Sequence, residues 1–327
     1  MSLASRHKFS VAPMMDWTDR HCRVFHRLFT KHAVLYTEMV TSEAILNGDR
    51  DHLLGYSPEK EGYVVLQVGG SDIYKCCEAA KISEDYGYNE INLNVGCPSD
   101  RVQSGRFGAC LMREPNLVAE ICQSMQKVTK VPVTVKCRIG VDDQDPHLIL
   151  PDFIQKVSDA GIKHIIIHAR KAWLKGLSPK DNRTIPPLDY DLIYKIKADN
   201  PNLIISINGG IDTIDAASEH LHHVDGVMVG RSAYHNPCLM RDVDQKLYND
   251  PSDARYDDKA LIAEMMHYIE DEMVEGHKFY IMAKHLLGFR HGQNGARKWR
   301  RYLTENGTKP NANAQTLLDA YEFAFSN

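Results

Sequence analysis

The sequence lacks any long hydrophobic run. Its apolar stretches, such as residues 165–167 and 227–229, are far shorter than the roughly 20 residues that cross a bilayer. The first residues also lack the apolar segment of a secretory signal. We therefore expect a cytoplasmic protein with no membrane partner.

The cysteines lack the paired spacing of a metal site. None of the 8 cysteines belongs to a C-x-x-C pair, which argues against structural zinc and, in the cytoplasm, against a disulfide framework. We expect no bound metal and reduced thiols. No obligate protein partner is evident from the sequence.

A strong overall charge is also missing. The 327 residues are 43% apolar and 25% charged, and the formal net charge is −4. This composition is that of an ordinary globular protein, and its charge predicts no general attraction to nucleic acid. A polyanionic partner would therefore need a local basic patch.

Short apolar or β-branched segments recur along the first 230 residues and alternate with helix-like stretches such as 116–129, 150–160, 190–198 and 214–220. This alternation predicts a parallel (β/α)₈ TIM barrel, an α/β fold. A doubly wound open sheet is less favoured, because no G-x-G-x-x-G follows the first segment. The predicted strands are 9–12, 35–39, 64–68, 90–95, 133–136, 164–168, 203–207 and 226–229.

The strand pattern stops near residue 243. Residues 259–273, 279–288 and 314–325 have amphipathic helical patterns. We therefore predict a barrel domain over 1–243 and a smaller all-α domain over 244–327.

Polar residues lie at the predicted C-terminal ends of the strands, where barrels build active sites. Asn208-Gly209-Gly210 follows the seventh strand and Gly230-Arg231 follows the eighth. Exposed backbone N–H groups, a helix N-terminus and a guanidinium form the usual barrel phosphate site. A phosphorylated cofactor or substrate is therefore expected, although an Asn-Gly-Gly alone is often only a turn.

Cys97 lies in the turn Asn94 to Ser99, directly after the fourth predicted strand. Gly96 and Pro98 restrict the backbone on either side of it. A thiol is mostly protonated at neutral pH, so one held at the barrel mouth could act as a general acid. The alternative is a thiol that only packs in the core.

Acidic residues are absent from residues 276–303, where 7 lysines and arginines occur together with Trp299 and Tyr302. Charge runs are usually solvated helix faces. In a net-acidic chain, however, this acid-free stretch predicts a surface that contacts an RNA backbone.

Residues 94–109, N-V-G-C-P-S-D-R-V-Q-S-G-R-F-G-A, resemble the signature of the tRNA-dihydrouridine synthases. The similarity extends over essentially the whole chain, through residues 12–19, 66–67, 135–136, 168–170, 208–210 and 230–231. The wording around residues 17–23, 107–112 and 295–303 is closest to the A-type branch, which points to D-loop uridines 20 and 20a of tRNA.

The resemblance implies bound FMN, NADPH as reductant and tRNA as substrate. Hydride would add to C6 of the uracil ring, and Cys97 would deliver the proton to C5. It also assigns positions by similarity. The flavin contacts would be Pro13, Met14, Met15, Gln67, Lys136, His168, Asn208, Gly209, Gly210, Gly230 and Arg231. The tRNA contacts would be Asn94, Lys180, Arg183, Arg297 and Arg300.

Three other functions remain open from the residues. The barrel and Cys97 could serve an FMN-dependent reductase of a small pyrimidine or enone, against which the basic C-terminal stretch argues. Lys136 could form a Schiff base in a flavin-free aldolase. A non-catalytic RNA-binding protein with a relic barrel is the third alternative.

Overall fold

The computed structural model describes residues 1–250 and 257–326. Eight parallel strands form one sheet in the order β1-β8-β7-β6-β5-β4-β3-β2. Val34 closes the barrel, because its backbone bonds to both Phe9 and Val11 of β1. The strands are β1 (Phe9–Val11), β2 (Leu35–Thr41), β3 (Val64–Gly69), β4 (Glu90–Val95), β5 (Val133–Arg138), β6 (His164–His168), β7 (Ile204–Asn208) and β8 (Gly226–Val229). The predicted TIM barrel is confirmed.

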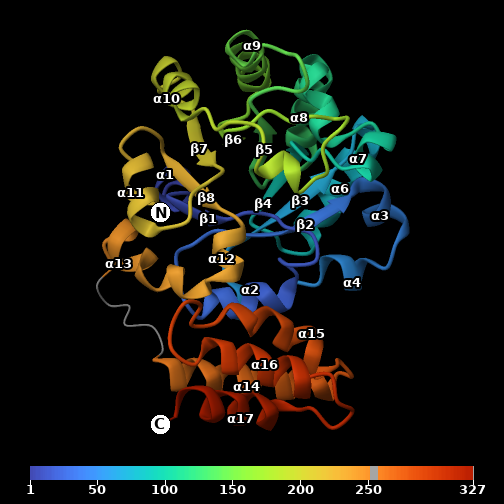
Figure 1. Ribbon diagram of the computed structural model, residues 1–327. Coiled ribbons are helices and arrows are strands. Elements are labelled where there is room, and N and C mark those ends of the chain that lie inside the picture. The colour runs from blue at the N-terminus through green and yellow to red at the C-terminus, as the bar shows by residue number, and fades with distance from the viewer. Residues whose placement is uncertain (251–256, 327) are drawn as a thin grey trace.

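Helices surround the barrel (Figure 1). Within the described residues they are α1 (Leu3–Arg6), α2 (Arg20–Arg27), α3 (Ser42–Asn47), α4 (Arg50–Leu54), α5 (Pro58–Glu61), α6 (Ile73–Asp85), α7 (Asp100–Ser104), η1 (Gly108–Arg113), α8 (Pro115–Val128), α9 (Pro146–Asp159), η2 (Asp181–Arg183), α10 (Tyr190–Asp199), α11 (Ile214–His220), α12 (Arg231–His235), η3 (Pro237–Asp242) and α13 (Val243–Tyr248). The four barrel helices expected from the sequence are present, with ends that differ by a few residues.

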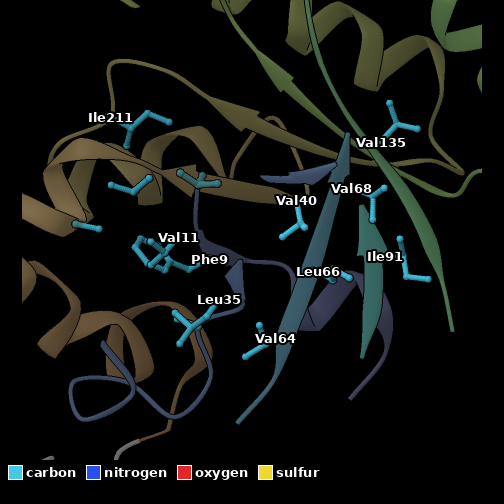
Figure 2. Close-up of a cluster of buried hydrophobic side chains, with 14 of the residues drawn as sticks. Phe9, Val11, Leu35, Val40, Val64, Leu66, Val68, Ile91, Val135 and Ile211 are labelled. Carbon is cyan, nitrogen blue, oxygen red and sulfur yellow. The ribbon is translucent and has the colours of Figure 1, made fainter. Parts of the chain in front are cut away.

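The core has two layers because strand side chains alternate between the two faces of the sheet. Val64, Leu66 and Val68 of β3 point outward and pack beneath the helices, as Figure 2 shows for this cluster. Val65 of the same strand points inward and joins a second, interior cluster. The inward positions of the strands therefore lead up to the barrel mouth.

The floor of the barrel is polar. Glu90 accepts hydrogen bonds from Tyr63 Oη at 2.6 Å and from His7 Nε2 at 2.7 Å, and His164 Nε2 pairs with Ser206 Oγ at 2.8 Å. His7, Glu90 and His164 are also close enough to hold a metal ion, each offering one ligand atom within 4.8 Å of the others. The absence of a bound metal therefore stays a prediction.

Buried histidines make stability depend on pH. Burial lowers the pKa of His26 to about 3, and burial lowers the pKa of His164 well below its usual value. Both stay neutral in the folded state at a pH where the unfolded chain takes up protons. Folding stability should therefore fall below pH 6.5, by about 1.4 kcal/mol per histidine by pH 5.5.

Urea unfolding between pH 7.5 and 5.5 measures this effect. His164→Asn should make the pH dependence shallower by about one proton. Equal slopes for the two proteins would mean that His164 is protonated in the folded protein.

The C-terminal helices form a layer beside α2 and α12 (Figure 1). Their bounds are α14 (Asp258–Val274), α15 (Phe279–Ala283), η4 (Lys284–Gly288), α16 (Ala296–Asn306) and α17 (Ala314–Phe325). The expected helices at 259–273 and 314–325 are present, and the one at 279–288 is divided into α15 and η4. Helix α16 was not predicted, because its charged residues drew attention to an RNA surface and not to a helical pattern.

The boundary between the two predicted domains was drawn at residue 243. Helix α13, which follows this boundary, contacts the barrel: Lys8 Nζ donates to the carbonyl of Leu247 at 3.0 Å, and Tyr248 Oη accepts from the backbone N–H of Phe9 at 3.0 Å. Residues 251–256 lie outside the described residues. The division stays a prediction, and these contacts favour a boundary after Tyr248.

Hydrogen bonds and close packing join the C-terminal helices to the barrel. Buried His285 bonds through Nε2 to Asp19 at 2.9 Å and through Nδ1 to Tyr234 Oη at 3.2 Å. A Cβ at Gly288 would lie 2.6 Å from the carbonyl oxygen of Tyr234, so only glycine allows this approach. Because Asp19 follows the β1 loop, the C-terminal helices are anchored directly beside the barrel mouth.

Candidate active site at the barrel mouth

The turn after β4 holds Cys97 half-buried at the barrel mouth. Asn94 Oδ1 accepts from the backbone N–H of Gly96 at 3.0 Å and of Cys97 at 2.9 Å. The carbonyl of Cys97 accepts from Ala109 N at 2.9 Å, which closes the loop behind it. Its Sγ lies 3.6 Å from Ser99 Oγ. The thiol is thus fixed at the end of a strand without being sealed in the core.

Gly108 allows that loop to close. It has φ +66°, and a Cβ there would lie 2.6 Å from the carbonyl oxygen of Cys97. Both the backbone angle and the space therefore require glycine. Cys110, two residues later, lies in η1, and burial raises the pKa of its thiol. The two thiols of the signature segment consequently occupy different environments.

Lys136 ends the inward row of β5. Its Nζ donates to Asn208 Oδ1 at 2.9 Å, while Asn208 Nδ2 donates to the carbonyl of Met228 at 2.8 Å. Burial and the neighbouring Arg138 lower the pKa of Lys136 to about 7. Lys136 is therefore close to half-protonated at neutral pH, and an anion beside it would favour the charged form.

Cys137, for which no role could be assigned, points to the other face of β5. It lies fully buried in the layer between barrel and helices. Burial raises its pKa to about 12. Cys137 is therefore a packing residue and does not face the barrel mouth.

Arginines crowd the mouth without a neutralising carboxylate close to them. Burial and repulsion from Arg183 and Arg170 lower the pKa of Arg138 even though the Cys97 thiol opposes the shift. Burial and Arg231 likewise lower the pKa of Arg183. Arg170 Nε is buried and has no hydrogen-bond partner within the described residues. This set of donors fits an anionic ligand, such as the phosphate of a nucleotide cofactor.

His168 and the glycines after β7 lie beside these arginines. A Cβ at Gly209 would meet the His168 ring at 2.7 Å, and Gly209 and Gly210 have φ +115° and +73°. Burial and the nearby cations lower the pKa of His168 well below its usual value, so the ring is neutral. The predicted phosphate turn thus has the backbone that glycine is needed for.

Other predicted cofactor contacts also lie at the mouth. Met14, half-buried, has its Sδ 3.8 Å from where a Cβ of Gly230 would lie, and Pro13 is half-buried beside it. Met15 is 53% exposed. Gln67 is buried in the interior and bonds to Asn94. Arg231 reaches the carbonyl of Arg183 at 3.4 Å, which links the two predicted ligand regions.

The loop after β6 carries the predicted tRNA contacts Lys180 and Arg183, both exposed. Asn182, which sequence reasoning missed, holds this loop: its Oδ1 accepts from Trp173 N at 2.6 Å and its Nδ2 donates to the carbonyl of Trp173 at 2.8 Å. Its only sequence signal was an asparagine between two charged residues. Without a fold, that signal could not be told from an ordinary turn.

Arg138 joins this loop to the Cys97 turn. Its Nε donates to the carbonyl of Gly96 at 3.2 Å, and its Nη1 donates to the carbonyl of Asn182 at 2.8 Å. Gln103 makes a second link, since its Nε2 donates to the carbonyls of Pro98 at 2.9 Å and Leu174 at 2.6 Å. The loops with the candidate acid and the candidate RNA contacts therefore form one unit.

Only part of the acid-free C-terminal stretch is an open basic surface. Lys284 pairs with Asp19 and Arg290 with Asp258, so these two cations have structural partners. Trp299 is fully buried and donates to the carbonyl of Leu286 at 2.8 Å. The inclusion of Trp299 in an RNA surface was therefore wrong. The cations that form no ion pair within the described residues are Lys278, Arg297, Lys298, Arg300 and Arg301.

Two faces of α16 separate these cations. Lys298 and Arg301 lie over the ring of Phe323, 5.9 and 6.0 Å from its centre. Arg297 and Arg300, three residues apart, share a different face of the helix. Arg297 is exposed and Arg300 half-exposed. No helix in the described part of the chain is long and apolar enough to cross a membrane.

Comparisons with known proteins agree with this geometry. The family model "Dihydrouridine synthase (Dus)" matches residues 10–325. A protein of Pasteurella multocida is 52% identical over 98% of this chain and 97% of its own length. One of Salmonella typhi is 54% identical over 96% of this chain and 94% of its own. Each is named a tRNA-dihydrouridine(20/20a) synthase. With its TIM barrel and the Cys97 signature turn, the chain belongs to the dihydrouridine synthase family.

Proposed function

We propose that this protein reduces uridines 20 and 20a in the D-loop of tRNA to 5,6-dihydrouridine, with FMN as bound cofactor and NADPH as reductant. The observation that carries the proposal is the half-buried Cys97 thiol, held at the barrel mouth beside cations that fit an anionic cofactor. Identity of 52–54% to relatives with this printed activity supports the substrate. We place the reaction in the cytoplasm.

The residues at the mouth divide into two groups around FMN. Gln67 and Lys136, with Pro13, Met14 and Met15, would contact the ring system. Reduced FMN would supply the hydride for C6 of the uracil ring. The phosphate end would be held by His168, Asn208, Gly209, Gly210, Gly230 and Arg231. The half-protonated Lys136 suits this arrangement, since it can take up a proton when an anion binds.

Cys97 would hold the proton that C5 requires. Hydride addition at C6 leaves negative charge on the uracil, and a thiol at the strand end can neutralise it. The base must leave its stack to reach the mouth, at a cost of a few kcal/mol. Lys180, Arg183, Arg297 and Arg300 would offset this cost by holding the backbone around the base, while a contact from Asn94 stays a prediction.

FMN affinity should depend on the protonation of Lys136. Because its pKa is about 7 in the protein without ligand, FMN binding above pH 7 requires proton uptake. The affinity should fall as the pH rises from 7 to 9, by at most about tenfold per pH unit. Lys136→Met should bind FMN more weakly at pH 7 and lose this dependence.

Titration of the apoprotein with FMN, followed by flavin fluorescence at each pH, measures both effects. If the wild-type affinity is as flat from pH 7 to 9 as that of Lys136→Met, Lys136 does not take up the proton.

The main alternative is reduction of a small pyrimidine or enone. Anaerobically reduced enzyme can be mixed with tRNA transcript, with uridine or with a simple enone, while flavin absorbance reports reoxidation. The proposal predicts rapid reoxidation by tRNA alone. Rapid reoxidation by uridine or the enone, with none by tRNA, would favour the small-molecule reductase.

A further inference from the structure

A chain of hydrogen bonds runs through the barrel interior toward Cys97. Thr134 Oγ1 donates to the carbonyl of Ile91 at 3.3 Å and accepts from Asn92 Nδ2 at 3.0 Å. Asn92 Oδ1 accepts from Gln67 Nε2 at 2.8 Å, and Gln67 Oε1 accepts from Asn94 Nδ2 at 2.8 Å. Asn94 Oδ1 then accepts from the Cys97 turn.

The strand register places these residues next to one another. Gln67 of β3 is paired with Asn92 of β4, and Asn92 is paired with Thr134 of β5. Asn94 lies two residues further along β4, one interior position closer to the mouth. Asn92 is fully buried and Thr134 almost so, which leaves protein groups as their hydrogen-bond partners.

Backbone groups fix the direction of the chain. The N–H groups of Gly96 and Cys97 can only donate, so the Asn94 atom that faces them must be its oxygen. The Asn94 amide nitrogen therefore faces Gln67, which must present its own oxygen. Gln67 then directs its nitrogen at Asn92, whose facing atom must again be oxygen. Each carboxamide thus has one satisfied orientation.

We propose that Asn92 is a positioning residue that locks the carboxamide of Gln67 in the orientation with Oε1 toward Asn94 and Nε2 toward Asn92. The inference rests on the proposed function, in which Gln67 contacts FMN. Asn92 lies beneath Gln67 and acts on FMN through it. Reversal of the Gln67 amide would place two donors or two acceptors against each other at both ends, so Asn92 prevents the flavin from meeting an incorrectly oriented amide.

A double-mutant cycle tests this role through FMN affinity. Asn92→Leu, which is similar in shape but has no hydrogen-bonding group, should weaken FMN binding about tenfold, as for loss of a buried hydrogen bond. In a Gln67→Met background the same change should have no further effect, because the residue acts only through Gln67. Equal losses in both backgrounds, or unchanged affinity in Asn92→Leu, would overturn the proposal.

Ser206→Ala is the matched control, since Ser206 is buried in the same barrel but bonds to His164 and lies outside the chain. It should lower the melting temperature without changing FMN affinity. A tenfold loss of affinity in this control would show that any interior polar deletion has the effect, and would contradict a specific role for Asn92. If Asn92→Leu does not fold, Asn92→Ser, too short to reach Gln67, replaces it.

The same four proteins of the cycle can be unfolded without FMN. Non-additive stabilities would support the Asn92–Gln67 contact independently of the flavin, and additive ones would contradict it. A wild-type protein that bound no FMN, yet had non-additive stabilities, would overturn the proposed function and leave the interaction established. The two failures are therefore distinguishable.

Discussion

Cys97→Ala should lose dihydrouridine formation by a factor of about 10² to 10⁴, the range expected for a lost general acid. The structure gives the reason, because Cys97 is the half-buried thiol that its turn holds at the barrel mouth. The Gly96 and Cys97 backbone contacts with Asn94 do not depend on the thiol. FMN binding and flavin reduction by NADPH should therefore stay close to wild type.

Single-turnover reduction of tRNA by prereduced enzyme measures the loss, with flavin reduction followed separately. Cys110→Ala is the matched control, since Cys110 lies in the same signature segment but within η1. It should retain tRNA reduction. An inactive Cys110→Ala beside an active Cys97→Ala would reverse the assignment of the acid.

Charge reversal at Arg297 and Arg300 should weaken tRNA binding by about 10- to 100-fold at physiological salt, because two phosphate contacts are replaced by repulsion. Both arginines lie on one face of α16 and form no ion pair within the described residues. The plot of log affinity against log salt should also become shallower by about two contacts. Flavin reduction by NADPH should not change with these residues.

The neighbouring face of α16 supplies the control. Lys298→Glu with Arg301→Glu makes the same change of charge at cations that lie over Phe323. A specific contact at Arg297 and Arg300 predicts a smaller loss of affinity for this pair. Equal losses would indicate a general electrostatic effect of the C-terminal helices, and no loss in either pair would remove α16 from the RNA surface.

The barrel was predictable because its strands are short, β-branched and separated by helical patterns. The ends of β4, β5, β7 and β8 could also be located, since the residues that follow are unusual: Cys97 between Gly96 and Pro98, and the glycines after β7. A residue at a strand end has a known place in a barrel even when its side-chain contacts are not known.

Contacts between distant segments could not be predicted. Asn92, Asn182 and Arg138 each bond to groups that lie far away in sequence or depend on the exact strand register. Trp299 was misplaced because the sequence shows its charged neighbours, whereas its burial depends on the packing of α16 against η4. The sequence located the candidate chemistry, and the fold supplied the residues that hold it.

The central claim is tested most directly by incubation of the purified protein with NADPH and unmodified tRNA transcript, followed by nuclease digestion and mass measurement of the fragments. The account predicts a gain of two hydrogens on each uridine at positions 20 and 20a, confined to the D-loop fragment. An unchanged D-loop fragment, from a flavin-loaded protein that still oxidises NADPH, would contradict it.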